Sequence, residues 1–201
     1  MQLPPGLETE VADLAARFGP TAFVTAALPD GVFDPFTRRD RVGEVCMVIR
    51  RPSGRLLTFR KDVYPQGVFR LLTGGINHGE SVQAALLREV EEETSLTVAL
   101  RRLMAVIGYS APESPAGVFS FYTFAFLLDE LSGSLAVQDL DERVEAFRDV
   151  EPAELPALAS YLEGLDDKVD RAIGGNWRSW GIFRAIVHRV VADQLTAPSV
   201  P

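Results

Sequence analysis

The residues best suited to chemistry lie between Gly74 and Leu96, where a glycine-rich stretch precedes a run of glutamates. Glu89, Glu92 and Glu93 fall within an arc of roughly 100° when the segment is drawn as a helix at about 100° per residue. Three carboxylates held this close repel one another unless a cation lies among them, and hard oxygen ligands suit Mg²⁺ or Mn²⁺. The spacing therefore predicts a divalent-metal site on one side of a helix.

A helix over residues 81–94 would carry these glutamates. Ser81 or a neighbour is suited to cap its first turn, and no Pro or Gly interrupts residues 80–94. Arg88 precedes Glu92 by one turn, a spacing that lets the two side chains pair. An apolar stripe would pin the helix to a sheet: Val82, Ala85, Leu86 and Val90. The preceding loop contains glycines that permit positive φ and close backbone approach to a ligand: Gly74, Gly75 and Gly79.

This stretch resembles the Nudix box, whose pattern is G, five residues, E, seven residues, then R-E-U-x-E-E-x-G-U with U aliphatic. Every specified position from Gly74 through Glu80 to Leu96 matches, except that Ser95 replaces the final glycine. A glycine there would accept the left-handed conformation that ends many helices. A serine costs on the order of 1 kcal/mol at such a site, or the turn takes another form. Because no metal ligand is lost, we expect catalysis to survive.

The resemblance implies a hydrolase acting on a nucleoside diphosphate linked to another group, with water attacking one phosphorus of the pyrophosphate. It assigns metal binding to Glu89, Glu92 and Glu93, often joined by the carbonyl of Gly74, with Mg²⁺ or Mn²⁺ as the cofactor. By the same resemblance, Arg88 would orient a neighbouring glutamate through a bidentate pair. The expected partner is therefore a small nucleotide substrate.

The general base has more than one candidate. Glu92 or Glu93 qualifies, because clustering with other carboxylates raises the pKa of a carboxyl group. Some family members take the base from a loop beyond the box, where Glu113, Glu142 and Glu145 are available. Among these we favour Glu142, in the acidic stretch DLDERVE. Residues expected to contact substrate are Gly75, His78, Pro112 and Glu113.

Two further stretches bear on the substrate. Pro112 lies near the position where ADP-ribose pyrophosphatases carry a proline in a loop over the substrate, although their Pro-Gly is Pro-Glu here. Residues 56–60 resemble the opening of the coenzyme A pyrophosphatase motif, although Leu72-Thr73 replaces its Phe-Pro. ADP-ribose or another nucleotide sugar is the leading prediction, and coenzyme A derivatives and nucleoside triphosphates are the alternatives. A non-catalytic ligand sensor is the alternative from another class, disfavoured because all three box glutamates are retained.

Aromatic residues and the C-terminal segment have less specific interpretations. Several aromatics are candidates to stack on a base: Tyr64, Phe69, Tyr109 and Tyr122. A wide apolar face at helical spacing predicts packing on the same domain or on a second subunit: Trp177, Trp180, Phe183, Val187, Val190 and Val191. This face motivates the hypothesis of a homodimer. Arg178 and Arg184 are candidates to reach substrate phosphates, and His188 is expected to be structural.

The composition fits a globular domain. The chain has 201 residues, 47% hydrophobic and 24% charged, with a formal net charge of −8. Such a charge argues against binding long nucleic acid, although it permits a small anion whose site contains a metal. Cys46 is the only cysteine and stands in an apolar run, so it is predicted to be a buried thiol. No signal peptide or membrane-length apolar run is visible, which predicts a cytoplasmic protein with no membrane partner.

Hydrophobic periodicity predicts the arrangement of elements. Strands are expected over 21–28, 42–50, 55–60, 69–73, 97–109, 118–129 and 144–150, with 42–50 and 55–60 forming a hairpin. Helices are expected over 7–18 and 178–195, and over 151–162 with an interruption near Pro156. The predicted fold is an α/β/α sandwich with a mixed β-sheet, as the Nudix resemblance also implies. Residues 42–163 would form the Nudix domain, with an N-terminal extension (1–41) and a C-terminal helical extension (164–201).

Overall fold

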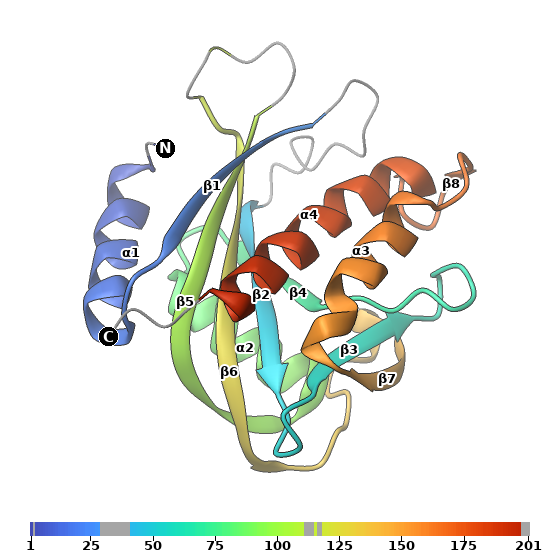
Figure 1. Ribbon diagram of the computed structural model, residues 1–201, viewed down its shortest axis with the longest axis horizontal. Coiled ribbons are helices and arrows are strands. Elements are labelled where there is room, and N and C mark those ends of the chain that lie inside the picture. Colours follow the sequence, from blue (N-terminus) through green and yellow to red (C-terminus); the bar gives the residue numbers. More distant parts are fainter. Residues whose placement is uncertain (2, 29–40, 111–114, 116–117, 198–201) are drawn as a thin grey trace.

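A mixed sheet lies between helices in the computed structural model, which describes residues 1, 3–28, 41–110, 115 and 118–197 (Figure 1). The helices are α1 (Pro5–Phe18), α2 (Val82–Thr94), α3 (Leu155–Glu163) and α4 (Trp177–Thr196). The strands are β1 (Ala22–Ala27), β2 (Arg41–Arg50), β3 (Leu56–Lys61), β4 (Leu72–Asn77), β5 (Leu96–Ser110), β6 (Phe121–Gly133), β7 (Val144–Val150), β8 (Val169–Asp170) and β9 (Gly175–Asn176). Two short 3₁₀ helices, η2 (Leu140–Glu142) and η3 (Pro152–Glu154), flank β7.

The sheet is built around β2. The strand order is β1-β5-β6-β2-β3-β7, and β4 also pairs with β2. β2 runs parallel to β6 and antiparallel to β4, but it meets β3 only where Arg50 faces Leu56. The predicted hairpin of 42–50 with 55–60 is therefore present only next to the turn, and it is wrong along the rest of the two strands. The reason is that β4 pairs with β2 from Arg41 to Met47, while β3 pairs along its length with β7.

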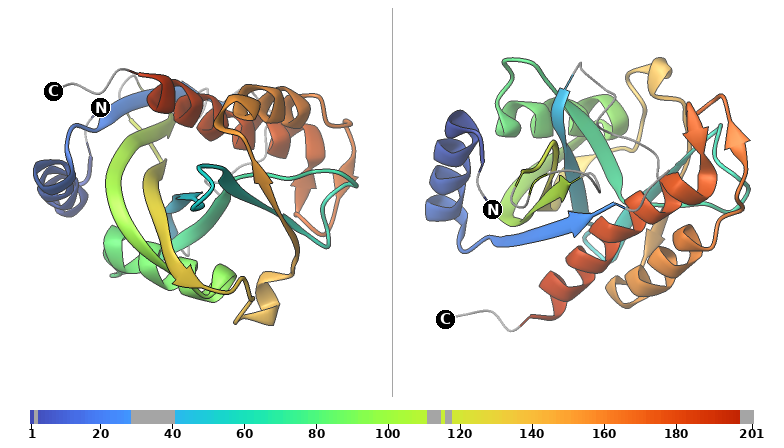
Figure 2. Two further views of the ribbon diagram at one scale, coloured as in Figure 1. Left: turned by 60° about the horizontal axis from the view of Figure 1, so that its bottom comes forward. Right: turned by 90° about the horizontal axis from the view of Figure 1, so that it is seen from above.

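Helices cover both faces of this sheet (Figures 1 and 2). On one face, α1 and α2 pack over a core that includes the fully buried side chains of Met47, Leu86 and Phe124. On the opposite face, α3 and α4 pack over a second core that includes Ile107 and Phe183. The predicted sandwich of a mixed sheet between helices is confirmed, with an N-terminal helix and a long C-terminal helix added to it.

Most elements lie within a few residues of their predicted positions, and two need correction. The helix expected from 151 does not break at Pro156; a 3₁₀ turn precedes α3, and Pro156 lies in its first turn, where a missing N–H is tolerated. The strand expected over 69–73 begins at Leu72 and continues to Asn77. It therefore contains Gly74 and Gly75, which were predicted to lie in a loop.

The apolar face of α4 packs within this chain. Trp177, Trp180 and Phe183 are all less than 5% exposed, as are Val187 and Val191. This confirms the predicted packing on the same domain and removes the apolar face as a reason to expect a homodimer. No helix within the described ranges has the length and apolar character needed to cross a membrane. Cys46 is fully buried, as predicted.

His188 joins α4 to the sheet from a fully buried position. Its Nε2 accepts a hydrogen bond from the Leu71 backbone N–H at 3.0 Å, and its Nδ1 donates to the Arg184 carbonyl at 2.8 Å. The contact with Leu71 requires the neutral ring, because a protonated Nε2 has no lone pair to accept that hydrogen bond. Burial lowers the pKa of His188 from 6.5 to about 4. The predicted structural role of His188 is therefore to link α4 to the residue that precedes β4.

This arrangement makes stability depend on pH through His188. Above pH 6.5 the ring is neutral in both states, so its contribution to folding is fully present. As the pH falls from 6.5 toward 4, the unfolded chain binds a proton that the folded chain excludes, which lowers the free energy of unfolding by up to about 3 kcal/mol. We expect the free energy of unfolding of His188→Gln, measured by denaturant titration between pH 7 and pH 4.5, to lack this pH-dependent contribution. The exposed His78, substituted as His78→Gln, is the matched control, and identical pH dependence in wild type and His188→Gln would contradict the assignment.

Candidate active site

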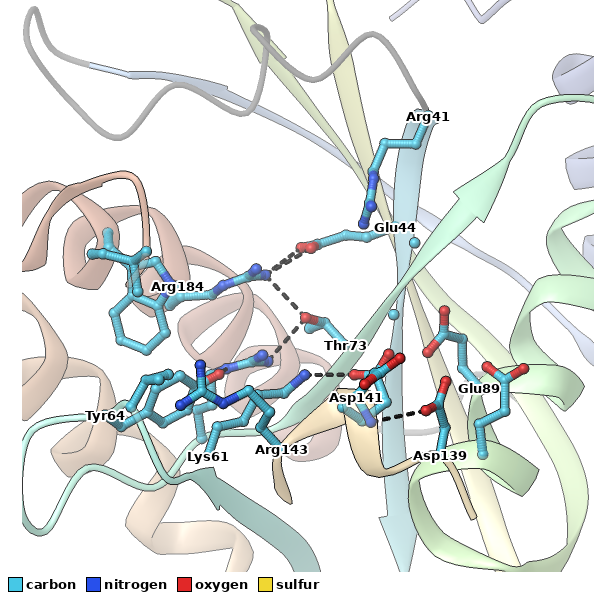
Figure 3. A pocket seen from close by; sticks show the side chains of 18 of the residues that line it. Arg41, Glu44, Lys61, Tyr64, Thr73, Glu89, Asp139, Asp141, Arg143 and Arg184 are labelled. Atoms are coloured by element: carbon cyan, nitrogen blue, oxygen red, sulfur yellow. Dashed lines mark hydrogen bonds and ion pairs between the residues drawn. The ribbon is translucent and has the colours of Figure 1, made fainter. Parts of the chain in front are cut away.

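A pocket of about 600 Å³ lies between the box helix α2 and the C-terminal helix α4 (Figure 3). Its volume falls in the range of small-molecule sites. Its walls contain six acidic side chains: Glu44, Glu89, Glu92, Asp139, Asp141 and Glu142. They also contain six basic side chains: Arg41, Lys61, Arg70, Arg88, Arg143 and Arg184. The pocket therefore has groups for both a cation and an anion.

The N-terminus of α2 is fixed from two directions. Ser81 Oγ accepts a hydrogen bond from the Ala84 N–H at 3.1 Å, which confirms the predicted cap. Glu10 of α1 accepts from the Val82 and Gln83 N–H groups, both at 3.0 Å. The negative charge of a carboxylate at this end also interacts favourably with the positive end of the helix dipole. The N-terminal helix therefore holds the helix that carries the box glutamates.

Arg88 is the centre of the box. Its guanidinium group forms a bidentate pair with Glu80 at 2.8 and 2.9 Å, and its Nη2 also donates to the Gly75 carbonyl at 2.8 Å. Its Nη1 donates to Glu89 and to Glu92, each at 2.8 Å. The pairing with Glu92 predicted from the i, i+4 spacing is present. One cation thus holds three carboxylates and ties α2 to β4.

The two glycines of β4 make room for charged side chains. A Cβ atom on Gly74 would lie 1.9 Å from Cδ of Glu89, and one on Gly75 would lie 2.3 Å from Nη1 of Arg41. Of the three box-region glycines, only Gly79 has a positive φ, at 79°. The predicted need for close approach therefore applies to Gly74 and Gly75, and the need for unusual backbone conformation applies to Gly79.

Glu93 is fully buried beside the pocket. Neither carboxylate oxygen accepts a hydrogen bond from any described residue, and Oε1 lies 3.6 Å from Nζ of Lys61. Burial raises the pKa of Glu93 to about 8, although the charges of Lys61 and Arg70 oppose the rise. Glu89 has one buried oxygen without a hydrogen-bond partner, Oε2, and burial raises its pKa too. Unpaired buried carboxylate oxygens are rare, and a ligand of the site would explain them.

Glu142 enters the pocket from η2. Lys61 Nζ donates to its Oε2 at 2.6 Å. Burial disfavours the charged form of Glu142, but the hydrogen bond and charge of Lys61, with further contributions from Glu93 and Arg70, outweigh burial and lower its pKa. Lys61 therefore lies between Glu142 and Glu93, one carboxylate from outside the box and one from within it. The sequence offered no signal for Lys61, because its neighbours in space are distant in the chain.

The other predicted site residues fall into three groups: those that line the pocket, those that do not, and those outside the described residues. Gly75, Glu89 and Glu92 line the pocket, as does Tyr64 among the candidate stacking aromatics. Several do not line it: His78 is exposed, Glu145 pairs with Arg60 at 2.7 Å, Tyr109 is buried in the core, and Arg178 is exposed on α4. Pro112 and Glu113 lie outside the described residues. Their predicted substrate contacts stay predictions.

Ser95 keeps the left-handed turn in which a glycine was expected. Its φ and ψ are 57° and 20°, and its backbone N–H donates to the Glu91 carbonyl. Its Oγ accepts from Gln138 Nε2 at 2.8 Å and donates to the Ala136 carbonyl at 3.1 Å. These bonds offset part of the cost of a side chain in this conformation.

A chain of buried polar groups forms the wall opposite the box. Arg184 Nη1 donates to both oxygens of Glu44, at 2.8 and 2.7 Å, and to Thr73 Oγ1 at 3.0 Å. Thr73 also accepts from Arg70 at 2.9 Å, and Thr123 donates to Glu44 at 3.0 Å. Sequence reasoning named Arg184 alone in this group. The apolar sequence of residues 42–50, which contains a single glutamate, was the available signal for Glu44.

The box residues fit a divalent metal ion. No three His, Cys, Asp or Glu side chains within the described ranges already surround a position suited to such an ion. The unpaired oxygens of Glu89 and Glu93 are nevertheless hard ligands next to the partly exposed Glu92. The donor set suits Mg²⁺ or Mn²⁺ better than a soft metal.

The space above Gly74 provides a test of this fit. We expect Gly74→Ala to displace the Glu89 side chain and to weaken Mn²⁺ binding, measured by isothermal titration calorimetry, by at least about tenfold. Gly6→Ala is the matched control, because a Cβ atom there meets nothing within 4 Å. Circular dichroism checks that both variants fold. Equal Mn²⁺ affinity in Gly74→Ala and wild type would rule out Glu89 in its present position as a ligand.

Comparison with known proteins identifies the domain. The NUDIX domain family matches residues 40–171. An ADP-ribose pyrophosphatase of Methanocaldococcus jannaschii is 34% identical over 101 residues, which cover 50% of this chain and 57% of that protein. An NAD-capped RNA hydrolase, NudC, of Photobacterium profundum is 29% identical over 119 residues, covering 59% of this chain and 41% of that protein. The matches thus span about half the length of these curated relatives.

Two solved structures also resemble this chain, at lower identity. An ADP-ribose pyrophosphatase from Streptococcus suis has 14% identity and a TM-score of 0.47, covering 79% of this chain and 95% of that one. A MutT NUDIX hydrolase from Burkholderia pseudomallei has 23% identity and a TM-score of 0.45, covering 78% and 98%. Because the family match covers well over half of the chain and includes the complete box region, the chain belongs to the Nudix hydrolase family.

Proposed function

We propose that this protein is a Mg²⁺- or Mn²⁺-dependent pyrophosphohydrolase that cleaves a nucleoside diphosphate linked to another moiety, with ADP-ribose or a nucleotide sugar as the leading substrate. The observation that carries the proposal is that Glu89 and Glu92 line a pocket of about 600 Å³ with Glu93 buried beside it, and that buried oxygens of Glu89 and Glu93 are unpaired. The 34% identity to a protein named as an ADP-ribose pyrophosphatase supports the choice of substrate.

The residues of the box and its neighbours would have different roles in the reaction. Glu89, Glu92, Glu93 and the Gly74 carbonyl would hold the metal ion, which when bound supplies positive charge to the phosphoryl oxygens and activates water. Arg88 keeps Glu89 and Glu92 in place through its hydrogen bonds. Lys61 lines the pocket next to these carboxylates, where its ammonium group suits a phosphoryl oxygen.

The proton from the attacking water needs an acceptor. Glu142 lines the pocket, and its lowered pKa keeps it ionised at neutral pH, so it is able to accept a proton there. Glu92 also lines the pocket, whereas Glu93 lies behind the wall. These positions favour Glu142 as the base, with Glu92 as the alternative from the box.

The enzyme proposal predicts metal-dependent turnover that requires Glu93. Phosphate release would be measured through a coupled phosphatase on ADP-ribose, other nucleotide sugars, dinucleoside polyphosphates, NADH, coenzyme A and nucleoside triphosphates. We expect Glu93→Gln to lower turnover by at least about 100-fold, because the variant removes a charged ligand without changing shape. Glu91→Gln, on the exposed side of the same helix, is the matched control.

The outcomes separate the alternatives. Turnover of coenzyme A or a nucleoside triphosphate in place of ADP-ribose would keep the reaction and replace the substrate. A folded protein that binds metal and nucleotide but hydrolyses nothing would favour a ligand sensor. Full activity in Glu93→Gln would contradict the mechanism, since the proposed metal site would then be unnecessary.

The assignment of the base gives a separate prediction. Glu142→Gln should lower kcat by about 100-fold or more with little change in KM, because general-base catalysis contributes about 10² to 10⁴ in rate. Glu145→Gln changes a glutamate three residues away that does not line the pocket, and its kcat should match that of the wild type. If Glu92→Gln shows the loss in kcat and Glu142→Gln does not, the base lies in the box.

A further inference from the structure

Arg70 is a buried cation whose hydrogen bonds all go to neutral groups. Its side chain lines the pocket, and the residue is 3% exposed. Its Nε donates to the Tyr64 hydroxyl at 2.8 Å, and its Nη1 donates to the Leu71 carbonyl at 2.8 Å and to Thr73 Oγ1 at 2.9 Å. Among the described residues, no carboxylate lies within ion-pair distance of it. Arginine stays charged in proteins, so this charge persists in the buried site.

A second guanidinium group meets Arg70 at the same atom. Arg184 Nη1 also donates to Thr73 Oγ1, at 3.0 Å, and Glu44 is its only carboxylate partner among the described residues. The two guanidinium groups therefore share a neutral hydroxyl, and only Arg184 has a carboxylate partner. The Nη2 groups of both donate no hydrogen bond to a described residue, and the buried Nε of Arg184 has no partner there either. This part of the pocket offers donors and an excess positive charge.

Aromatic rings hold Arg70 in one orientation. Its guanidinium carbon lies 4.6 Å from the ring centre of Phe59, 5.6 Å from that of Tyr64 and 6.0 Å from that of Trp180. Such contacts stabilise a buried cation only in part, and an unbalanced buried charge remains costly. An anion that reached the free donors would supply the missing charge. A fixed, planar guanidinium group also suits phosphate or carboxylate geometry.

Arg184 lies across the pocket from the box, whereas Arg70 is near enough to Glu93 for its charge to favour the ionised form of that carboxyl group. In Figure 3, Tyr64 and Arg184 are on the side of the pocket opposite Glu89, and Thr73 lies between them. If the scissile pyrophosphate is held by metal at Glu89 and Glu92, a different part of the substrate must occupy the arginine side. The pocket is large enough to hold both parts of a nucleoside diphosphate derivative.

Resting on the proposed function, we propose that Arg70 and Arg184 form an anion subsite for a phosphate or carboxylate group on the substrate moiety remote from the scissile pyrophosphate. The preferred substrates of this enzyme are then nucleoside diphosphate derivatives with an additional negative charge. Arg70 determines that preference, because its charge has no carboxylate partner within the described residues. Its removal also leaves no carboxylate without a partner, whereas removal of Arg184 takes the ion-pair partner from Glu44.

Matched substrate pairs test this subsite. The pairs are NADPH with NADH, coenzyme A with dephospho-coenzyme A, and UDP-glucuronate with UDP-glucose, which differ by one phosphate or by one carboxylate. We expect kcat/KM of the wild type to favour the charged member of at least one pair by about tenfold or more. Arg70→Gln should bring that ratio close to one, and Arg70→Lys should give an intermediate ratio. Arg178→Gln, exposed on α4 and outside the pocket, is the control and should keep the wild-type ratio.

Three results would overturn the subsite. They are a wild-type enzyme without preference in any pair, a ratio unaffected by Arg70→Gln, and a loss that is equal for both members of a pair. The last result would mean either that Arg70 contacts the scissile pyrophosphate or that the protein needs Arg70 to fold. Circular dichroism distinguishes these two explanations.

Binding of the same pairs with Ca²⁺ present, measured by calorimetry, separates this proposal from the enzymatic one. Selective binding of the charged member that Arg70→Gln abolishes would support the subsite even if no substrate is hydrolysed. Turnover without such selectivity would support the enzyme and reject the subsite.

Discussion

The structure of the site depends on one cation, Arg88, which is shared by three carboxylates. Glu80, Glu89 and Glu92 would repel one another at these distances, and Arg88 contacts all of them at 2.8–2.9 Å. Its further bond to the Gly75 carbonyl fixes the helix relative to the strand. The oxygen of Glu89 that Arg88 does not satisfy is thereby left in a defined position beside the buried Glu93. A metal site needs that combination of held and unsatisfied ligands.

Both flanking helices act on the same site, one from each side of the sheet. Glu10 of α1 binds the first N–H groups of α2, and α1 packs on the core beneath that helix. On the other face, α4 is tied to the start of β4 by His188 and contributes Arg184 to the pocket. The strand that bears Gly74 and Gly75 is therefore held between two additions to the central domain. Their packing is part of how the pocket keeps its shape.

The parts of the site that sequence reasoning reached are those with local spacing. The box helix, its Ser81 cap and the Arg88–Glu92 pair depend on residues within one or two turns of one another, so periodicity was enough. The sandwich fold and the position of β7 followed from patterns of similar length. The pairing of β2 with β4 in place of β3 did not follow, because strand pairing depends on contacts between distant segments. Lys61, Glu44 and Arg70 were missed for the same reason, since each becomes notable only through its neighbours in space.

The separation of charges within the pocket explains how a protein with a negative net charge could bind an anionic substrate. A net charge of −8 disfavours anionic ligands in general. Inside the pocket, however, Glu80, Glu89 and Glu92 gather around Arg88, while Arg184 pairs with Glu44 and shares the Thr73 hydroxyl with Arg70 at the opposite wall. A divalent ion among the carboxylates would reverse the field at that end, and the other end is already positive. An elongated, multiply charged nucleotide would then meet positive charge at both ends of the pocket, although most of the protein surface repels it.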